Sequence, residues 1–197
     1  MSRVARYRTV YVLIFGGLGA LTYVAVRAAG GSSSALLAAG LLLFMPGRLQ
    51  GLLLRPLFRG QRALAHGKPE EAFRHFHYQL SQLQAQPWRR LALWLGWSTY
   101  TPSLAAMVTN NLGAAHAALG ELEQAQAAWR HSLALDHLYP IPYANLAAAA
   151  AARGASDEAH SLLGQAQELG YSGGPLDQAT HRVMQLLAAV ESRGPAA

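Results

Sequence analysis

Two long runs without a charged residue open the chain, and they limit what it can fold into. The first run, 9–26, has 18 residues and the second, 28–47, has 20. A helix of 18 residues rises about 27 Å, close to the ~30 Å hydrocarbon core of a bilayer. Glycines and serines at 30–34 suit a tight turn between the two runs. The sequence therefore predicts a transmembrane helical hairpin over 1–47, with spans at about 9–26 and 29–46.

Each run also fits a second interpretation. The first resembles a cleaved signal peptide, because arginines precede an apolar stretch, although Arg27 stands where a cleavage site would need small residues. The second run begins with small and polar residues and ends at Pro46–Gly47, so it also fits a buried or re-entrant helix. Small residues in both runs (Gly16, Gly17, Gly19, Ala20, Ala38, Ala39 and Gly40) would let the two helices of the hairpin approach closely.

Arginines flank the hairpin unevenly, and this predicts its topology. Arg27 is the only basic residue near the turn, whereas the outer flanks carry Arg3, Arg6 and Arg8 before the first run and Arg48, Arg55, Arg59 and Arg62 after the second. The positive-inside rule then places the N-terminus and everything after the hairpin in the cytoplasm. If the second run does not cross, the rest of the chain lies on the outer side instead.

An amphipathic stretch, 49–58, follows the second run. Its leucines alternate with arginines, as in helices that lie at a membrane interface. We therefore expect Arg48, Arg55, Arg59 and Arg62 to reach lipid headgroups. The same leucines also suit packing against the next helices, and the two interpretations are compatible.

The composition favours an all-α fold beside a membrane. Alanine, leucine and glycine dominate, and β-branched residues are sparse. The chain has no cysteine, which excludes disulfides and thiolate metal sites. Residues 1–90 carry 12 basic and two acidic residues, whereas 91–197 carry four basic and eight acidic ones. Because the basic half is also the hydrophobic half, a bilayer rather than nucleic acid is the anionic surface we expect.

A spacing of 34 residues recurs in the second half of the chain. The positions that match at this spacing are Leu112 with Leu146, Gly120 with Gly154, Ala125 with Ala159 and Trp129 with Leu163. A fixed period of this length is typical of stacked helix pairs, in which small residues allow close contact and larger apolar residues fill the space around them.

The spacing resembles that of the tetratricopeptide repeat family, whose motif reads W-x2-L-G-x2-Y, then A-x3-F, then P. The unit 106–139 matches at Leu112, Gly113, Ala125 and Trp129 and departs at Thr109, His116 and His137; the unit 140–173 has Tyr143, Leu146, Ala147, Ala159 and Leu163. A degenerate unit begins near Leu53, with its turn at 67–72 and Phe76 beyond. The resemblance implies a short α-solenoid, which a capping helix over 174–197 would close.

The resemblance also implies where a protein partner would bind. In the family, the first helix of each pair lines the inner face; by position, that face holds Met107, Asn110, Asn111, Ala114, Ala117, Ala118, Ala144, Ala148 and Ala151. This wall is shallow and apolar and carries no basic residue, so a helix or an extended peptide fits it better than a carboxylate terminus. Segments of the chain itself are the other occupant that such a groove admits.

A tryptophan-rich insert interrupts the period. Residues 48–105 combine the amphipathic stretch, the degenerate unit and this insert, which holds three of the four tryptophans. Its candidate interface residues are Trp88, Trp94, Trp97 and Tyr100. Aromatic residues beside two arginines fit a plug between repeats, a membrane interface or a protein contact.

No catalytic, cofactor-binding or metal-binding motif occurs in the sequence. The histidines lack the spacing of metal ligands. We therefore expect no enzyme activity, cofactor, metal, nucleic acid or small-molecule substrate. The sequence predicts a membrane-tethered scaffold or adaptor for protein–protein interaction, with a permanent accessory or assembly subunit of a larger membrane complex as the alternative.

Overall fold

The computed structural model describes residues 3–95 and 100–171, and this part of the chain is helical throughout apart from short connections. Its elements are eight α-helices and one 3₁₀ helix, with no strand among the described residues. The all-α prediction is confirmed. The predicted capping helix over 174–197 lies outside the described residues.

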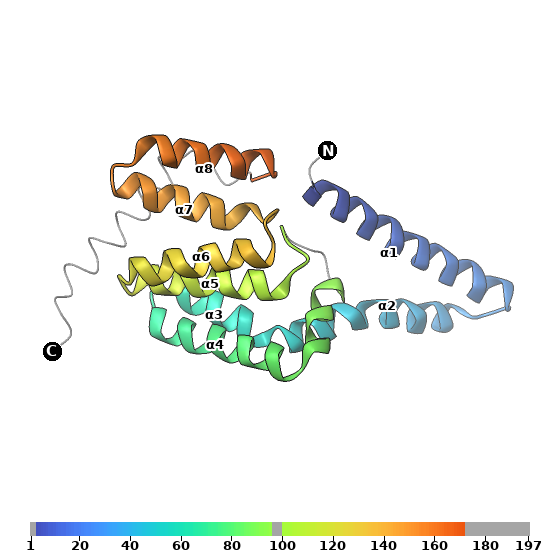
Figure 1. Ribbon diagram of the computed structural model, residues 1–197. Helices are drawn as coiled ribbons and strands as arrows, with labels where there is room; N and C mark the ends of the chain where they lie inside the picture. Colours follow the sequence, from blue (N-terminus) through green and yellow to red (C-terminus); the bar gives the residue numbers. More distant parts are fainter. Residues whose placement is uncertain (1–2, 96–99, 172–197) are drawn as a thin grey trace.

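Two apolar helices form a hairpin that projects from the remaining helices (Figure 1). They are α1 (Arg3–Ala28) and α2 (Ser33–Leu53). Gly30, at a φ of 69°, follows α1, and the Ser32 hydroxyl caps α2 by accepting a hydrogen bond from the Ala35 amide. The segments Thr9–Ala28 and Ser33–Leu53 are long and apolar enough to cross a bilayer, and neither is buried in the protein.

The second helix is longer than the sequence predicts. An end is expected at Pro46–Gly47, but α2 continues through Pro46 to Leu53. A proline inside a helix removes one backbone hydrogen bond and crowds the preceding turn. Tertiary contacts support the helix there, because α2 packs against residues 87–95 and Gln50 Nε2 donates a hydrogen bond to the Leu93 carbonyl. Leu54, which is buried, then separates α2 from the next helix, so no flexible linker follows the hairpin.

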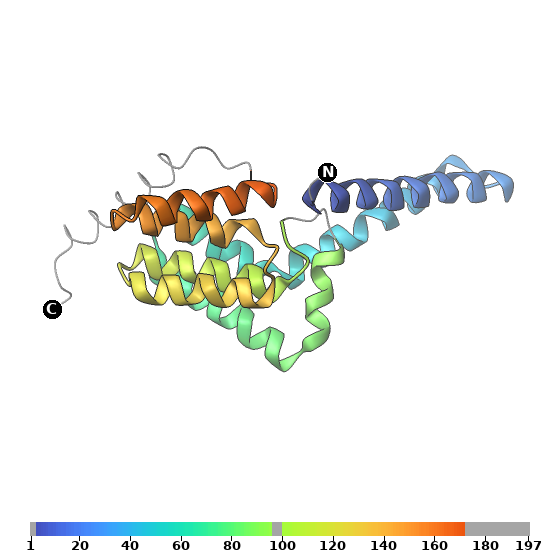
Figure 2. The ribbon, with the colours of Figure 1, turned by 45° about the horizontal axis from the view of Figure 1, so that its top comes forward.

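Six further helices form three pairs that stack side by side (Figures 1 and 2). The pairs are α3 (Arg55–Ala65) with α4 (Pro69–Ala85), α5 (Leu104–Ala118) with α6 (Leu122–Leu135), and α7 (Pro140–Ala152) with α8 (Ser156–Glu168). Between pairs, α4 packs on α5 and α6 packs on α7. The 3₁₀ helix η1 (Pro87–Leu95) packs on α2 and α4.

The same glycine turn joins the two helices of each pair. Gly67, Gly120 and Gly154 have φ values of 67°, 82° and 81°, a left-handed conformation that glycine adopts without steric cost. In each turn the next amide donates to the carbonyl five residues earlier, at 2.9 to 3.0 Å, which satisfies an end carbonyl of the first helix. The three pairs therefore share one local design.

A close contact inside the first and second pairs repeats in the same register. A Cβ on Gly60 would lie 2.4 Å from the Phe76 ring, and one on Gly113 would lie 2.5 Å from Nε1 of Trp129. In all three pairs the small residue stands seven positions before the turn glycine and the large residue nine positions after it; the third pair has Ala147 and Leu163 there. The first unit therefore has a small and a large residue at the same two positions as the other units. The sequence pattern does not predict this role for Gly60.

We expect the replacement Gly113→Ala to lower the melting temperature. Its Cβ would collide with Trp129, which is 2 % exposed, and overpacking of this kind costs about 1–3 kcal/mol. Gly164→Ala is the control, because a Cβ there meets nothing within 4 Å and helix propensity rises. The measurement is thermal loss of the circular-dichroism signal for the full chain in detergent. Equal melting temperatures for the two variants would contradict the close contact.

Candidate functional site

Most residues of the predicted groove are buried. They lie on α5 and α7, the first helices of the second and third pairs. Their exposed fractions are 3–7 % for Met107, Asn110, Ala117, Ala144 and Ala148, while Asn111, Ala114, Ala118 and Ala151 are half-buried. The accessible surface that this face offers to a partner is therefore small and comes from the four half-buried residues.

Asn110 connects two helix pairs. Its side-chain oxygen accepts a hydrogen bond of 2.9 Å from Nδ2 of Asn145 on α7. Its backbone carbonyl accepts a hydrogen bond of 3.2 Å from Nε1 of Trp129 on α6. The neighbouring Asn111 has a buried Nδ2 that lacks a hydrogen-bond partner among the described residues. Asn110 thus contributes to the stacking of the pairs, because buried polar groups are stable only when they are paired.

The tryptophan-rich insert has a buried part and an exposed part. Ala92 and Leu93 are 1 % and 3 % exposed and join the core of the first pair. Trp88 and Leu91 are 56 % and 63 % exposed. Tyr100 is half-buried, whereas Trp97 and the side chain of Trp94 lie outside the described residues. One part of the insert is therefore buried in the core, and another part is exposed.

A buried polar cluster joins the start of α5 to the connection between α6 and α7. Thr101 Oγ1 donates to Asp136 Oδ2 at 2.5 Å, and the Leu138 amide donates to Asp136 Oδ1 at 3.2 Å. Tyr139, 5 % exposed, lies beside them. Burial raises the pKa of the Tyr139 phenol, and the charges of Asp136 and Tyr100 raise this pKa further.

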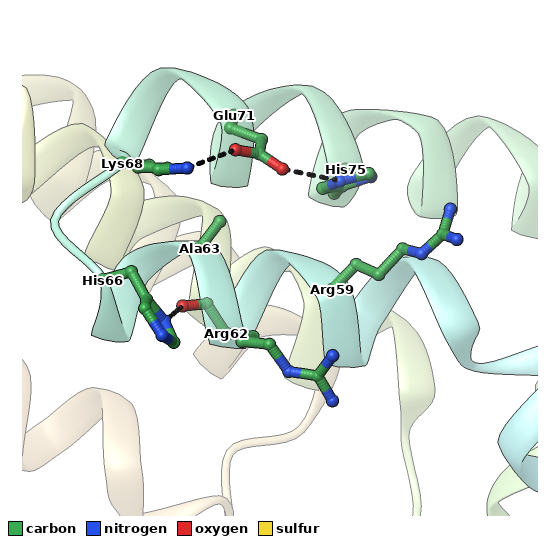
Figure 3. Close-up of a pocket in the computed structure, with 7 residues that line it drawn as sticks. All are labelled: Arg59, Arg62, Ala63, His66, Lys68, Glu71 and His75. Atoms are coloured by element: carbon green, nitrogen blue, oxygen red, sulfur yellow. Dashed lines mark hydrogen bonds and ion pairs between the residues drawn. The ribbon is translucent and has the colours of Figure 1, made fainter.

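An open pocket of about 480 Å³ lies along α3 and α4 (Figure 3). Arg59, Arg62, Ala63 and His66 line it from the α3 side, and Lys68, Glu71 and His75 line it from the α4 side. The Glu71 carboxylate lies 4.0 Å from Lys68 Nζ and 3.7 Å from His75 Nε2.

The pocket carries an excess of positive charge. Arg59 and Arg62 are exposed, and neither has an acidic partner within the described part of the chain. Glu71 is the only acid among the lining residues. The sequence predicted contact with lipid for these two arginines but did not single out Lys68, Glu71 or His75. The sequence does contain a signal for this pocket, because the spacing of Arg59, Arg62 and His66 places all three on one face of a helix.

The pocket is the face of the first pair that no earlier pair covers. The positions of Arg59 and Arg62 correspond, 53 residues later, to Leu112 and Ala115, which pack against the core of the first pair. Another 34 residues later they correspond to Leu146 and Ala149, which pack around Trp129. A terminal face must be polar for solubility, but solubility does not require an excess of one charge. The arrangement is suited to binding an anionic group.

Among residues 3–95 and 100–171, no group of three or more histidine, aspartate or glutamate side chains lies close enough together to hold a metal ion. The chain matches no protein-family model, and no curated protein shows significant similarity to it.

We expect the protein to lose stability in alkaline solution, partly through Tyr139. The folded-state pKa of this phenol is raised, so its contribution is complete below the unfolded pKa of about 10 and is lost as the pH rises through the folded value. Melting temperatures at about pH 8 and about pH 11 should differ less for Tyr139→Phe than for the unmodified chain. The exposed Tyr78, replaced by phenylalanine, is the control. An identical pH dependence for the Tyr139 variant would contradict this assignment.

Proposed function

We propose that this chain is a membrane-anchored helical-repeat scaffold that holds a protein partner at the cytoplasmic face of a bilayer. The hairpin carries the proposal. Leu13, Leu21, Leu37 and Leu41 are 66–71 % exposed, in a chain whose other helices bury their apolar faces. Burying one such side chain is worth about 1.5–3 kcal/mol, so hydrocarbon is the environment that stabilises α1 and α2.

The repeated geometry of the helix pairs supports a tetratricopeptide-type solenoid. Equivalent glycine turns occur at Gly67, Gly120 and Gly154, and the first two pairs share the same contact of a glycine with a large ring, as the repeat motif implies for those positions. Solenoids of stacked helix pairs present extended surfaces that bind peptides and proteins. This architecture favours a binding role over catalysis.

The arrangement of the hairpin supports a cytoplasmic repeat domain. The start of α1 and the end of α2 lie on the same side, next to the helix pairs, and the turn between them lies at the far tip (Figure 1). Exposed Arg6, Arg48 and Arg55 belong to the side of the helix pairs. The positive-inside rule assigns that side to the cytoplasm.

The open pocket supports a partner segment that is acidic. Its lining runs from Arg59 to His66, about 10 Å along α3, which exceeds the size of a single carboxylate. Arginine binds carboxylates through two parallel hydrogen bonds. The pocket lies open, whereas most residues of the predicted groove are buried. We therefore favour the pocket as the primary contact.

A permanent subunit of a larger membrane complex is the second candidate function. Glycines at 16, 17, 19 and 40 were expected to bring α1 and α2 together, but a Cβ on any of them would meet nothing within 4 Å. The hairpin therefore does not use them for its own packing. Glycine faces of this kind allow close contact with another transmembrane helix.

The topology is tested with single cysteines in the cysteine-free chain. Ser33→Cys lies at the tip of the hairpin and Glu121→Cys in the turn between α5 and α6; both parent side chains are exposed. In intact cells we expect a membrane-impermeant maleimide to label Ser33→Cys, and to label Glu121→Cys only after permeabilisation. The reverse pattern would place the repeats outside, and labelling of both sites in intact cells would contradict the spanning hairpin.

The partner surface is tested by purifying the full chain in mild detergent and identifying the proteins that accompany it. We expect Arg59→Ala/Arg62→Ala to lower recovery of the partner at least about tenfold, since charge-assisted contacts contribute about 1.5–3 kcal/mol each. Arg74→Ala/Arg130→Ala, two exposed arginines outside the pocket, is the matched control. Loss with Ala114→Trp alone would favour the groove, and loss with Gly17→Leu alone would favour the subunit role.

A further inference from the structure

The two ends of the stacked pairs differ in chemistry. The glycine turns all lie at the end far from the hairpin (Figure 1), where charged residues such as Lys68, Glu121 and Arg153 surround them. The other end, from which the hairpin projects, consists of residues 86–95, 100–103, 135–140 and 168–171, and we call it the hairpin end. It contains η1 and the connection between α6 and α7.

Large apolar side chains are exposed mainly at the hairpin end. Among the described residues outside α1 and α2, the large hydrophobic side chains with high exposure are Phe58, Tyr78, Trp88, Leu91, Leu135 and Leu138. Four of these six belong to the hairpin end, with exposed fractions of 56 % for Trp88, 63 % for Leu91, 42 % for Leu135 and 38 % for Leu138. A soluble domain gains nothing by gathering such residues at one end.

Arginines accompany these apolar residues. Arg89 lies over the ring of Trp88, with its guanidinium carbon 5.6 Å from the ring centroid, and Arg90 is exposed beside it. Arg48 and Arg55 are exposed where α2 passes into α3. Asp136 is buried in the polar cluster, so among the described residues the exposed acid at this end is Glu168, at the end of α8. Tryptophan, leucine and arginine together are typical of a membrane interface.

The connection to the hairpin sets the height of this end above a bilayer. Gln50 Nε2 donates a hydrogen bond of 3.4 Å to the carbonyl of Leu93 in η1. Gln50 belongs to the last turn of the candidate span Ser33–Leu53. A segment bound to that turn lies at the level where the span leaves the hydrocarbon. Since Leu54 is buried and joins α2 to α3 without a linker, the helix pairs are held at the same height.

We propose that the hairpin end of the helix pairs rests on the lipid bilayer, with Trp88, Leu91, Leu135 and Leu138 at the boundary between headgroups and acyl chains. Arg48, Arg55, Arg89 and Arg90 then face lipid phosphates. The inference rests on the proposed function, because it requires the hairpin to span the membrane. It adds a second attachment, which fixes the tilt of the stack and directs the glycine turns away from the membrane.

The test uses single cysteines in the full chain, each labelled with an environment-sensitive fluorophore. Leu91→Cys and Leu138→Cys report on the hairpin end, Glu123→Cys on the end with the glycine turns, and Leu41→Cys on the span. The protein is reconstituted alone into vesicles of phosphatidylcholine with a smaller share of phosphatidylglycerol, with or without lipids brominated at shallow or deep acyl positions. These four parent side chains are exposed, so the changes spare the core.

We expect the fluorophores at 91 and 138 to emit at shorter wavelength than the one at 123 and to be quenched by lipids brominated at shallow positions. The fluorophore at 41 should be quenched by deep bromines, and the one at 123 by neither. If 91 and 138 behave like 123 while 41 is quenched, the contact with the bilayer is wrong and the anchored scaffold stands. If 41 is not quenched either, the proposed function fails as well.

Discussion

The direct connection of α2 to α3 at the buried Leu54 is the constraint on which the rest of the structure depends. On one side of this residue the helix is apolar and uncovered, and on the other side the helices bury their apolar faces against one another. If the hairpin spans a bilayer as proposed, water and hydrocarbon meet close to Leu54. Because no linker separates the two parts, the helix pairs cannot turn freely relative to the hairpin.

The three helix pairs share the same local structure. The first pair differs on the face that no other pair covers. Each pair has a left-handed glycine turn, and in the first two pairs a glycine lies against a large aromatic ring. In the second and third pairs, leucine and alanine fill the contact with the preceding pair; in the first, Arg59 and Arg62 stand at those positions. The polar character of this face therefore follows from being first in the stack, because apolar residues there would face water, whereas its excess of positive charge does not.

The proposed anchor, the pocket and the hairpin end would together give a scaffold a defined orientation. The glycine turns lie at one end of the stack, the exposed Trp88, Leu91, Leu135 and Leu138 belong to the other end, and the pocket lies along α3 and α4. A flexible tether would let a bound partner sample many orientations. A stack attached at two places would present its partner at one height and one angle above the bilayer.

Local and periodic features were decided by the sequence alone. The two charge-free runs are long enough for spans, and the 34-residue spacing specifies helix pairs, because both signals depend only on neighbours along the chain.

The tertiary structure decided which faces are covered. It buried Asn110 between two pairs and brought Arg59, Lys68 and His75 to one pocket. It also left one part of the insert buried and another part exposed. It also assigned Gly60 to a complete first unit, which the insert had hidden by lengthening the spacing to 53 residues. These outcomes depend on contacts between helices that are distant in the chain, and no periodicity along the sequence encodes them.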